Sequence, residues 1–283
     1  MKKRFRGKGR TSDEAKRDHA HRNWQATHVR AKRDIRQRDI FHAQWQQLYD
    51  QCSDPGSHVR LVGLREQYER RQLGVSEPAQ VETEVASFML LAGFTVAFLE
   101  ETAIRTADLE CYLGEHRLFV EATAILRNQV RPEGDMALGH NGPQRLKEGD
   151  AHQDALARRL MARMAEKARQ LNRYCAPILL AITIPTIERQ EEEAREPDQV
   201  DLHRLAGLLS TALHEFPQLT AVLLTCWNLT PMPARSNIRL HNAYWVTRSK
   251  GGSAFPRIRL LVMNPSAAYG LEEQEVHALR AAL

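Results

Sequence analysis

The fold of this chain is set by residues 108–125, which read DLECYLGEHRLFVEATAI. Two runs suited to β-strands, 108–113 and 117–125, are joined there by Gly114-Glu115-His116. A link that is short and contains glycine, placed between two such runs, is typical of a β-hairpin. Glu121 lies inside the second run among apolar neighbours. Because a buried carboxylate is costly unless a cation or hydrogen bonds compensate it, this glutamate is a candidate site residue.

Helices and strands alternate on both sides of the hairpin. Before it, a helix from Ser76-Glu77-Pro78 to a stop at Gly93 leads into a strand over 95–100. After it, the pattern predicts a long polar loop over 128–150, helices over 151–174 and 200–215, and strands over 176–185, 219–227, 239–247 and 257–264. Strands separated by helices, together with one antiparallel hairpin, indicate an α/β domain built on a mixed sheet.

The first 75 residues form a separate part of the sequence. A polar helical stretch extends to about Gln51, a turn follows at Asp54-Pro55-Gly56-Ser57, and a second helix stops at Gly74. Apolar residues become frequent toward the end of the first helix, so we expect that half to dock on another element. The sequence therefore predicts a helical extension over 1–75 and an α/β domain over 76–283.

Positive charge is concentrated at the start of the chain. The whole chain has 40 Lys/Arg and 35 Asp/Glu, whereas residues 1–40 hold 14 and 5, so this segment is +9 and the remainder −4. Such a segment suits a polyanion, because Lys and Arg near phosphates release condensed counterions. A solvated leader that only aids solubility is the alternative. The candidate nucleic-acid contacts are Lys2, Lys3, Arg4, Arg6, Lys8 and Arg10.

Composition excludes several classes of protein. With 42% hydrophobic and 27% charged residues, the chain is neither disordered throughout nor collagen-like. It has no apolar run of the ~18 to 20 residues that a membrane helix needs, and no apolar stretch follows the basic start as in a secretory signal. Its four cysteines lack CxxC spacing, which fits a reducing compartment. We therefore expect a cytoplasmic protein without a membrane partner.

Carboxylates on the hairpin are the leading candidates for a metal site. Asp108 opens the first strand and Glu121 lies inside the second, with either Glu82 or Glu84 on the preceding helix as a third candidate. Mg²⁺ takes oxygen ligands, retains several waters and accepts a phosphate as a further ligand. The structural alternative is that Glu121 pairs with an arginine or faces solvent.

The order helix, strand, Asp-bearing strand, tight turn, Glu-bearing strand, helix resembles the core of the PD-(D/E)XK nuclease superfamily. Thr106-Ala107-Asp108 corresponds to its "PD", and Glu121-Ala122-Thr123 to its "(D/E)XK". The resemblance covers roughly 76–185, and 263–267 (MNPSA) is similar to the closing "NPxA" segment of a bacterial subgroup that has "VExT". It implies a restriction-endonuclease-like mixed β-sheet flanked by helices, here with an N-terminal helical extension.

The resemblance also implies a catalytic centre. Asp108, Glu121 and Glu82 would bind Mg²⁺ or Mn²⁺, with the backbone carbonyl of Ala122 as a further ligand. The usual lysine is replaced by Thr123, which cannot supply a cation. Lys167, on the helix after the hairpin, is the candidate replacement, and Gln170 could hydrogen-bond in the same site. The alternative is that Lys167 is one of several cations on an amphipathic helix.

These features favour a metal-dependent nuclease that acts on nucleic acid, with DNA preferred to RNA because the resemblance leans that way. A role in bacterial genome defence or in a mobile element would fit. The alternative is a nuclease-fold protein that binds nucleic acid without cleaving it, as the missing lysine suggests. A third hypothesis is that the N-terminal helices dock a partner subunit or a second copy of the chain. Convergence of Asp108, Glu121 and Lys167 separates the first hypothesis from the second.

Overall fold

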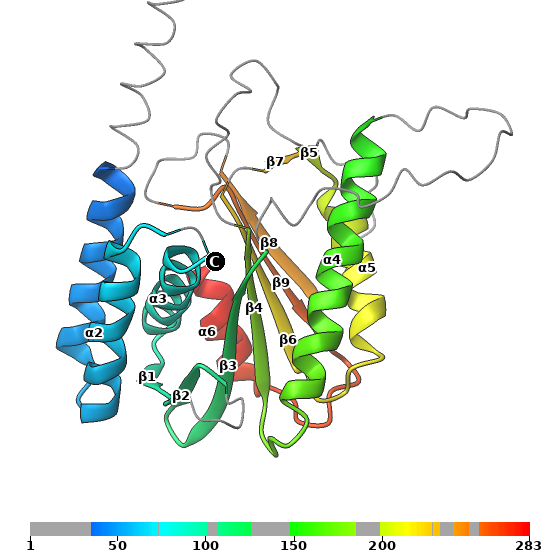
Figure 1. Cartoon of the computed structure of the whole chain (residues 1–283). Helices are drawn as coiled ribbons and strands as arrows, with labels where there is room; N and C mark the ends of the chain where they lie inside the picture. Colours follow the sequence, from blue (N-terminus) through cyan, green and yellow to red (C-terminus); the bar gives the residue numbers. More distant parts are fainter. Residues whose placement is uncertain are drawn as a thin grey trace, which may run out of the picture.

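The computed structural model of the chain describes residues 35–72, 74–100, 107–125, 148–184, 199–227, 229–232, 240–248 and 255–283, with 148–153 described by their backbone alone. Seven strands of this part form one sheet in the order β1-β2-β3-β4-β6-β9-β8 (Figure 1). The strands are β1 Thr95–Phe98, β2 Leu109–Leu113, β3 His116–Ala124, β4 Ile178–Ile184, β6 Ala221–Cys226, β8 Ala243–Thr247 and β9 Ile258–Met263. The neighbours β3, β4 and β6 run parallel, and the other neighbouring strands run antiparallel. The predicted mixed-sheet α/β class is confirmed.

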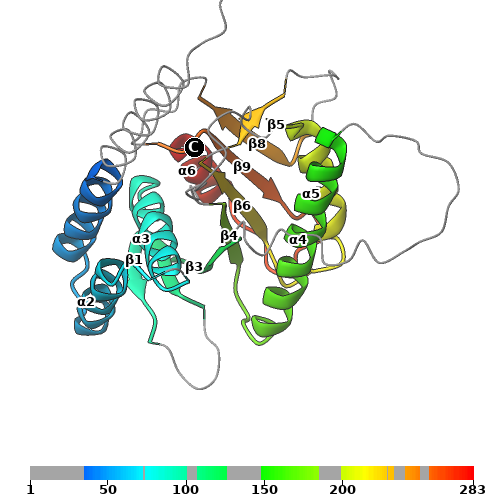
Figure 2. The ribbon, with the colours of Figure 1, turned by 45° about the horizontal axis from the view of Figure 1, so that its top comes forward.

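Helices cover both faces of the sheet (Figures 1 and 2). One face packs against α3 (Ser76–Leu91) and α6 (Glu273–Ala282), and the other against α4 (Glu148–Gln170) and α5 (Leu202–Leu213). Side chains alternate along β3, so Leu118 and Val120 join the α3 core whereas Phe119 joins the α4 core. The same alternation places Glu121 on the α4 face.

The two N-terminal helices pack outside α3 as a hairpin. Residues 35–51 are helical, and α2 follows as Pro55–Glu69. Phe41 stacks on Tyr68 with ring centroids 3.7 Å apart, and Trp45 Nε1 donates a hydrogen bond of 2.7 Å to the carbonyl of Leu61. The expected docking of the first helix is therefore onto α2, within a core shared with α3.

The segment predicted as a turn at 54–57 is the start of α2. Asp54 is its N-cap and accepts a hydrogen bond of 2.7 Å from the backbone N of Ser57, while Pro55 occupies the first turn. The Ser57 hydroxyl in turn accepts 2.7 Å from the backbone N of Phe98 in β1. The extension is thereby joined to the edge of the sheet as well as to α3.

Other differences concern elements that the sequence did not predict. The helix α6 begins with Glu272 and Glu275, whose side chains cap each other's backbone N–H groups. Glutamate is not among the favoured N-cap residues, so the pattern gave no start signal there. The strands β5 (Gln199–Val200) and β7 (Thr230–Pro231) form an unpredicted pair. Residues 148–150, assigned to a loop from the sequence, belong to α4, and the rest of that predicted loop lies outside the described residues up to 147.

Within the described part of the chain, every helix is too short or too polar to cross a bilayer.

Candidate active site

The hairpin of β2 and β3 brings Asp108 and Glu121 together. Its turn contains Gly114, whose φ of 63° is a conformation that glycine adopts readily. The last paired residues are Leu109 and Val120, so Asp108 and Glu121 follow as the next positions where β2 begins. The backbone N of Asp108 still donates to the carbonyl of Val120 at 3.1 Å. The predicted hairpin is confirmed, and it places the two carboxylates on neighbouring strands.

Just beyond the last residue pair of the β2–β3 ladder, the Asp108 carboxylate accepts a hydrogen bond from the backbone of β3. Its Oδ2 accepts a hydrogen bond of 2.7 Å from the backbone N of Ala122. Burial, followed by the nearby charge of Glu121, raises the pKa of Asp108 to about 7, although the Ala122 N–H and the charges of Lys167 and Arg60 oppose this shift. Two crowded carboxylates of this kind gain from a divalent cation, which favours the ionised form of both.

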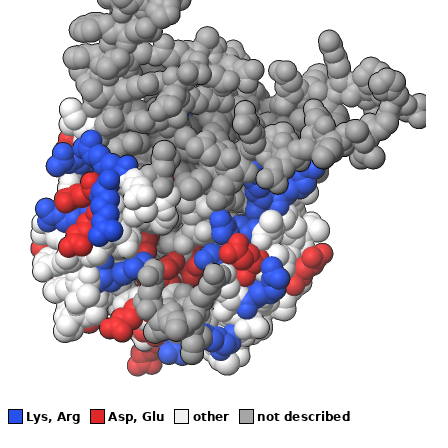
Figure 3. Space-filling view, viewed as in Figure 1, with Lys and Arg blue, Asp and Glu red and all other residues white. Residues whose placement is uncertain are grey.

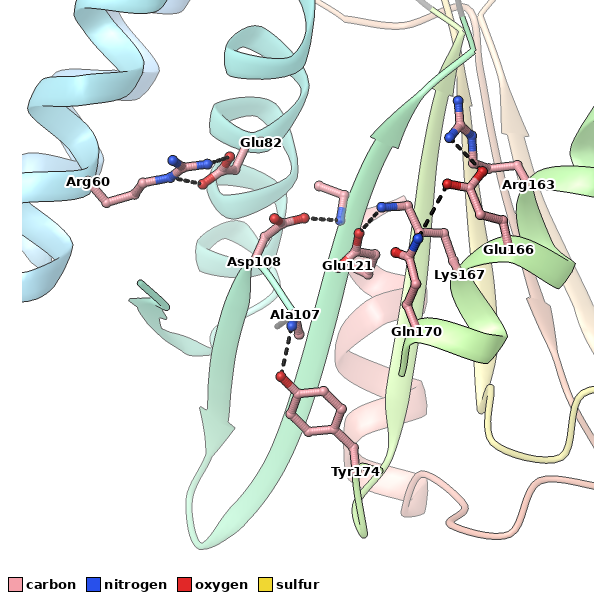
Figure 4. A network of polar contacts seen from close by, with 11 residues as sticks. Arg60, Glu82, Ala107, Asp108, Glu121, Arg163, Glu166, Lys167, Gln170 and Tyr174 are labelled. Carbon is pink, nitrogen blue, oxygen red and sulfur yellow. Dashed lines mark hydrogen bonds and ion pairs between the residues drawn. The ribbon is translucent and has the colours of Figure 1, made fainter. Parts of the chain in front are cut away.

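Lys167 extends from α4 toward the two carboxylates, on the face of the sheet that α4 covers. It lies near the end of α4, and its Nζ donates to Glu121 Oε1 (Figure 4). Glu121 is 4% exposed, so this ion pair compensates a carboxylate that burial would otherwise penalise. Sequence analysis named Lys167 as the replacement for the missing lysine, and the structure places its ammonium on Glu121. Its part in chemistry stays a prediction.

Glu82 lies on the opposite side of Asp108 from this ion pair (Figure 4). Its two carboxylate oxygens accept hydrogen bonds of 2.8 and 2.6 Å from the Arg60 guanidinium. Arg60 belongs to α2, so the helical extension supplies a side chain to the candidate site. Sequence reasoning missed Arg60, because nothing in the local pattern of α2 relates it to a glutamate on another helix.

Glu84, the second choice for the third carboxylate, does not join this centre. One oxygen accepts 3.0 Å from Trp227 Nε1 at the end of β6, and the other has no hydrogen-bond partner among the described residues. Burial raises the pKa of Glu84 to about 7, against the opposing effects of Arg259 and Trp227. Trp227 follows β6 and Arg259 belongs to β9, and both strands are separated from the Asp108 hairpin by β4.

Two further polar side chains border the centre. Gln170, expected to hydrogen-bond within the site, donates instead to Glu166 Oε1 at 3.3 Å, and Glu166 also pairs with Arg163 at 2.9 Å. Tyr174, which sequence reasoning missed, accepts 2.8 Å from the backbone N of Ala107 and so fixes the chain just before Asp108. Figure 4 shows this network extending from α2 to α4.

The segment 263–267 contributes hydrogen bonds that stabilise the fold. Asn264 Nδ2 lies 2.9, 3.1 and 2.8 Å from the carbonyls of Leu213, Phe216 and Leu219, and thus closes the turn between α5 and β6. Thr123, at the position where the resemblance leads us to expect a lysine, is 9% exposed on the α4 face of β3. The predicted nucleic-acid contacts Lys2, Lys3, Arg4, Arg6, Lys8 and Arg10 all lie outside the described residues.

Few of the described side chains near Asp108 and Glu121 could serve as metal ligands. Among the described residues, no group of three or more His, Cys, Asp or Glu side chains is arranged to hold a metal ion. Arg60 binds both carboxylate oxygens of Glu82, whereas Lys167 binds only Oε1 of Glu121. The candidate oxygen donors are therefore Asp108, Glu121 and the Ala122 carbonyl. Mg²⁺ commonly binds through one or two carboxylates and keeps several waters, so this set fits Mg²⁺ better than a metal that needs an all-protein cage.

We expect the Arg60–Glu82 pair to contribute strongly to stability. Arg60→Gln leaves a buried carboxylate without its guanidinium and should lower the free energy of unfolding by about 2 to 4 kcal/mol. Adding Glu82→Gln should recover much of this loss, with a coupling above about 1.5 kcal/mol in a double-mutant cycle from urea unfolding. Additive effects of the two substitutions would contradict a direct pair.

Glu84 should make stability depend on pH. Its folded pKa of about 7 exceeds the ordinary value of 4.5, so the folded state binds more protons, and the wild type loses stability as pH rises between these values. The free energy of unfolding of Glu84→Gln, relative to that of the wild type, should therefore rise by about 2 to 3 kcal/mol between pH 5 and pH 8, as measured by urea unfolding. Glu115→Gln, at an exposed turn, is the control, and an equal pH profile for both variants would contradict the assignment.

Comparisons with known proteins returned no match to a family model, to a curated protein or to a solved structure.

Proposed function

We propose that this chain is a metal-dependent phosphodiesterase that cleaves nucleic acid, with a restriction-endonuclease-like core of the PD-(D/E)XK kind. The observation that carries the proposal is the convergence of three side chains from distant parts of the sequence. Asp108 and Glu121 meet across the hairpin, and Lys167 extends from α4 onto Glu121. A site that served only to stabilise the fold would not need a second, partly buried carboxylate whose pKa is raised to about 7.

Each side chain has a part in the proposed reaction. Mg²⁺ or Mn²⁺, held by Asp108, Glu121 and the Ala122 carbonyl, would supply an activated water and offset the charge of the phosphate. The Ala122 N–H orients the Asp108 carboxylate toward the centre. Lys167 orients Glu121, and its ammonium can donate to the attacking water or to a phosphate oxygen. Glu82, held by Arg60, assists through water rather than as a direct ligand.

The substrate is a nucleic acid, with DNA preferred on the resemblance alone. The segment 1–40 has a net charge of +9 and suits a phosphate backbone, which predicts binding with little sequence readout and steep salt dependence. A cytoplasmic location is part of the proposal and accords with four cysteines that form no disulfide. A role in bacterial genome defence would fit these properties.

Two observations favour the alternative of a binding protein without activity. Thr123 leaves the motif without its lysine, and Arg60 binds the third carboxylate. The third hypothesis, a partner subunit or a homodimer through the N-terminal helices, stays a prediction. Phe41, Trp45 and Leu48, the apolar side chains that motivated it, are buried within the chain itself.

Cleavage assays test the proposal. Labelled duplex DNA, single-stranded DNA and RNA are incubated with the full chain and Mg²⁺ or Mn²⁺, for wild type, Asp108→Asn and Glu121→Gln. Removing either carboxylate should reduce cleavage by about 100-fold or more, because several kcal/mol of transition-state stabilisation depend on the metal. Glu110→Gln removes a nearby carboxylate that pairs with Arg117 and should leave cleavage unchanged.

Metal-dependent cleavage that is lost in both variants and kept in Glu110→Gln would establish the activity and identify the substrate. Salt-sensitive binding with the same background cleavage in all four proteins would instead establish the inactive binding protein.

A further inference from the structure

The helix α4 has two flanks with different surroundings. On one flank Asp154 pairs with Arg204 of α5 at 2.7 Å. On the other, Lys167 reaches Glu121 on β3. A helix advances 1.5 Å and turns by about 100° per residue. Arg163 and Arg159 therefore lie about 6 and 12 Å before Lys167 along the axis of α4, and Arg159 is rotated about 80° around that axis from Lys167. Three cations thus lie on the flank that faces away from α5 and toward the candidate active site.

Arg159 is the member of this row without an internal partner. Arg163 pairs with Glu166 and Lys167 with Glu121. For Arg159, the buried Nη1 atom has no hydrogen-bond partner, and no ion pair joins it to any residue that the structure describes. The Arg159 side chain as a whole is partly exposed, so the rest of its guanidinium can donate to an anion from solvent. Figure 3 shows basic side chains along α4 on the face seen in Figure 1.

From this arrangement we infer that the α4 flank is a binding site for the phosphodiester backbone of a nucleic-acid strand, with Arg159 as its principal phosphate contact. The inference rests on the proposed function, because the strand continues from the cleaved phosphate near Lys167 toward Arg159, about 12 Å along the axis. A planar guanidinium matches two phosphate oxygens at once, which suits Arg159 better than a lysine would. This site is distinct from the predicted contacts in the segment 1–10.

The neighbouring Arg158 provides a matched control. Arg158 is exposed. It lies nine residues before Lys167, which places it about 180° around the helix axis from Lys167. Arg158→Gln and Arg159→Gln therefore change the net charge equally on the same helix, yet only the second removes a cation from the flank that faces the site. Any effect of overall charge alone would be the same in both variants.

Binding of fluorescein-labelled single-stranded and duplex DNA to the full chain is measured by anisotropy in EDTA, over a series of salt concentrations. Arg159→Gln should weaken binding about five- to eightfold at 0.1 M salt and reduce the salt slope by about 0.7 for single strands or 0.9 for duplex. Arg158→Gln should weaken binding less than about twofold. Arg159→Lys, which keeps the charge, should keep the slope and provides the comparison if the glutamine variant is unstable.

Equal losses in the two glutamine variants, or no loss in either, would overturn the inference. It would also be overturned if pyrophosphate at low concentration abolished the difference, because the flank would then bind a small phosphate ligand rather than a strand. These outcomes are independent of cleavage. If the wild type cleaves nucleic acid but the two glutamine variants bind DNA equally well, only the α4 binding site is disproved. If Arg159→Gln alone binds DNA more weakly and the wild type shows no metal-dependent cleavage, only the nuclease proposal is disproved.

Discussion

The compensation of two neighbouring carboxylates is the constraint on which the rest of this structure depends. Asp108 and Glu121 lie side by side where the β2–β3 ladder begins, and each needs a donor that its own strand cannot provide. The Ala122 N–H satisfies the first and Lys167 the second. Lys167 reaches Glu121 because β3 and β4 are parallel, and a parallel pair requires a crossover, which here carries α4 across that face of the sheet.

The N-terminal helices take part in the same arrangement. Arg60 on α2 binds Glu82 on α3, and its charge also opposes the raised pKa of Asp108. Phe41, Trp45 and Leu48 bury their side chains in the core that α3 shares with the sheet. The described part of the extension therefore supports the site from behind α3, and it is more than a carrier of the basic segment that precedes it.

The hairpin, the succession of helices and strands around it and the acidic pair could be predicted from sequence, because each depends on neighbours within about a dozen residues. Gly114 marks the turn, and alternation places Leu118 and Val120 opposite Glu121. Arg60, Tyr174 and Trp227 could not be predicted as members of their clusters. Their partners lie 22, 67 and 143 residues away in the chain, and only the folded packing brings them together. The capping box of α6 was missed because its N-cap is a glutamate.

In the function proposed above, Asp108 and Glu121 form one metal-binding centre. Calorimetric titration of the full chain with Mn²⁺, without nucleic acid, tests this claim directly. We expect a saturable site for which Mg²⁺ competes, which Asp108→Asn and Glu121→Gln each abolish and which Glu110→Gln retains. Saturable binding that both variants keep, or no binding to the wild type at any accessible concentration, would contradict it.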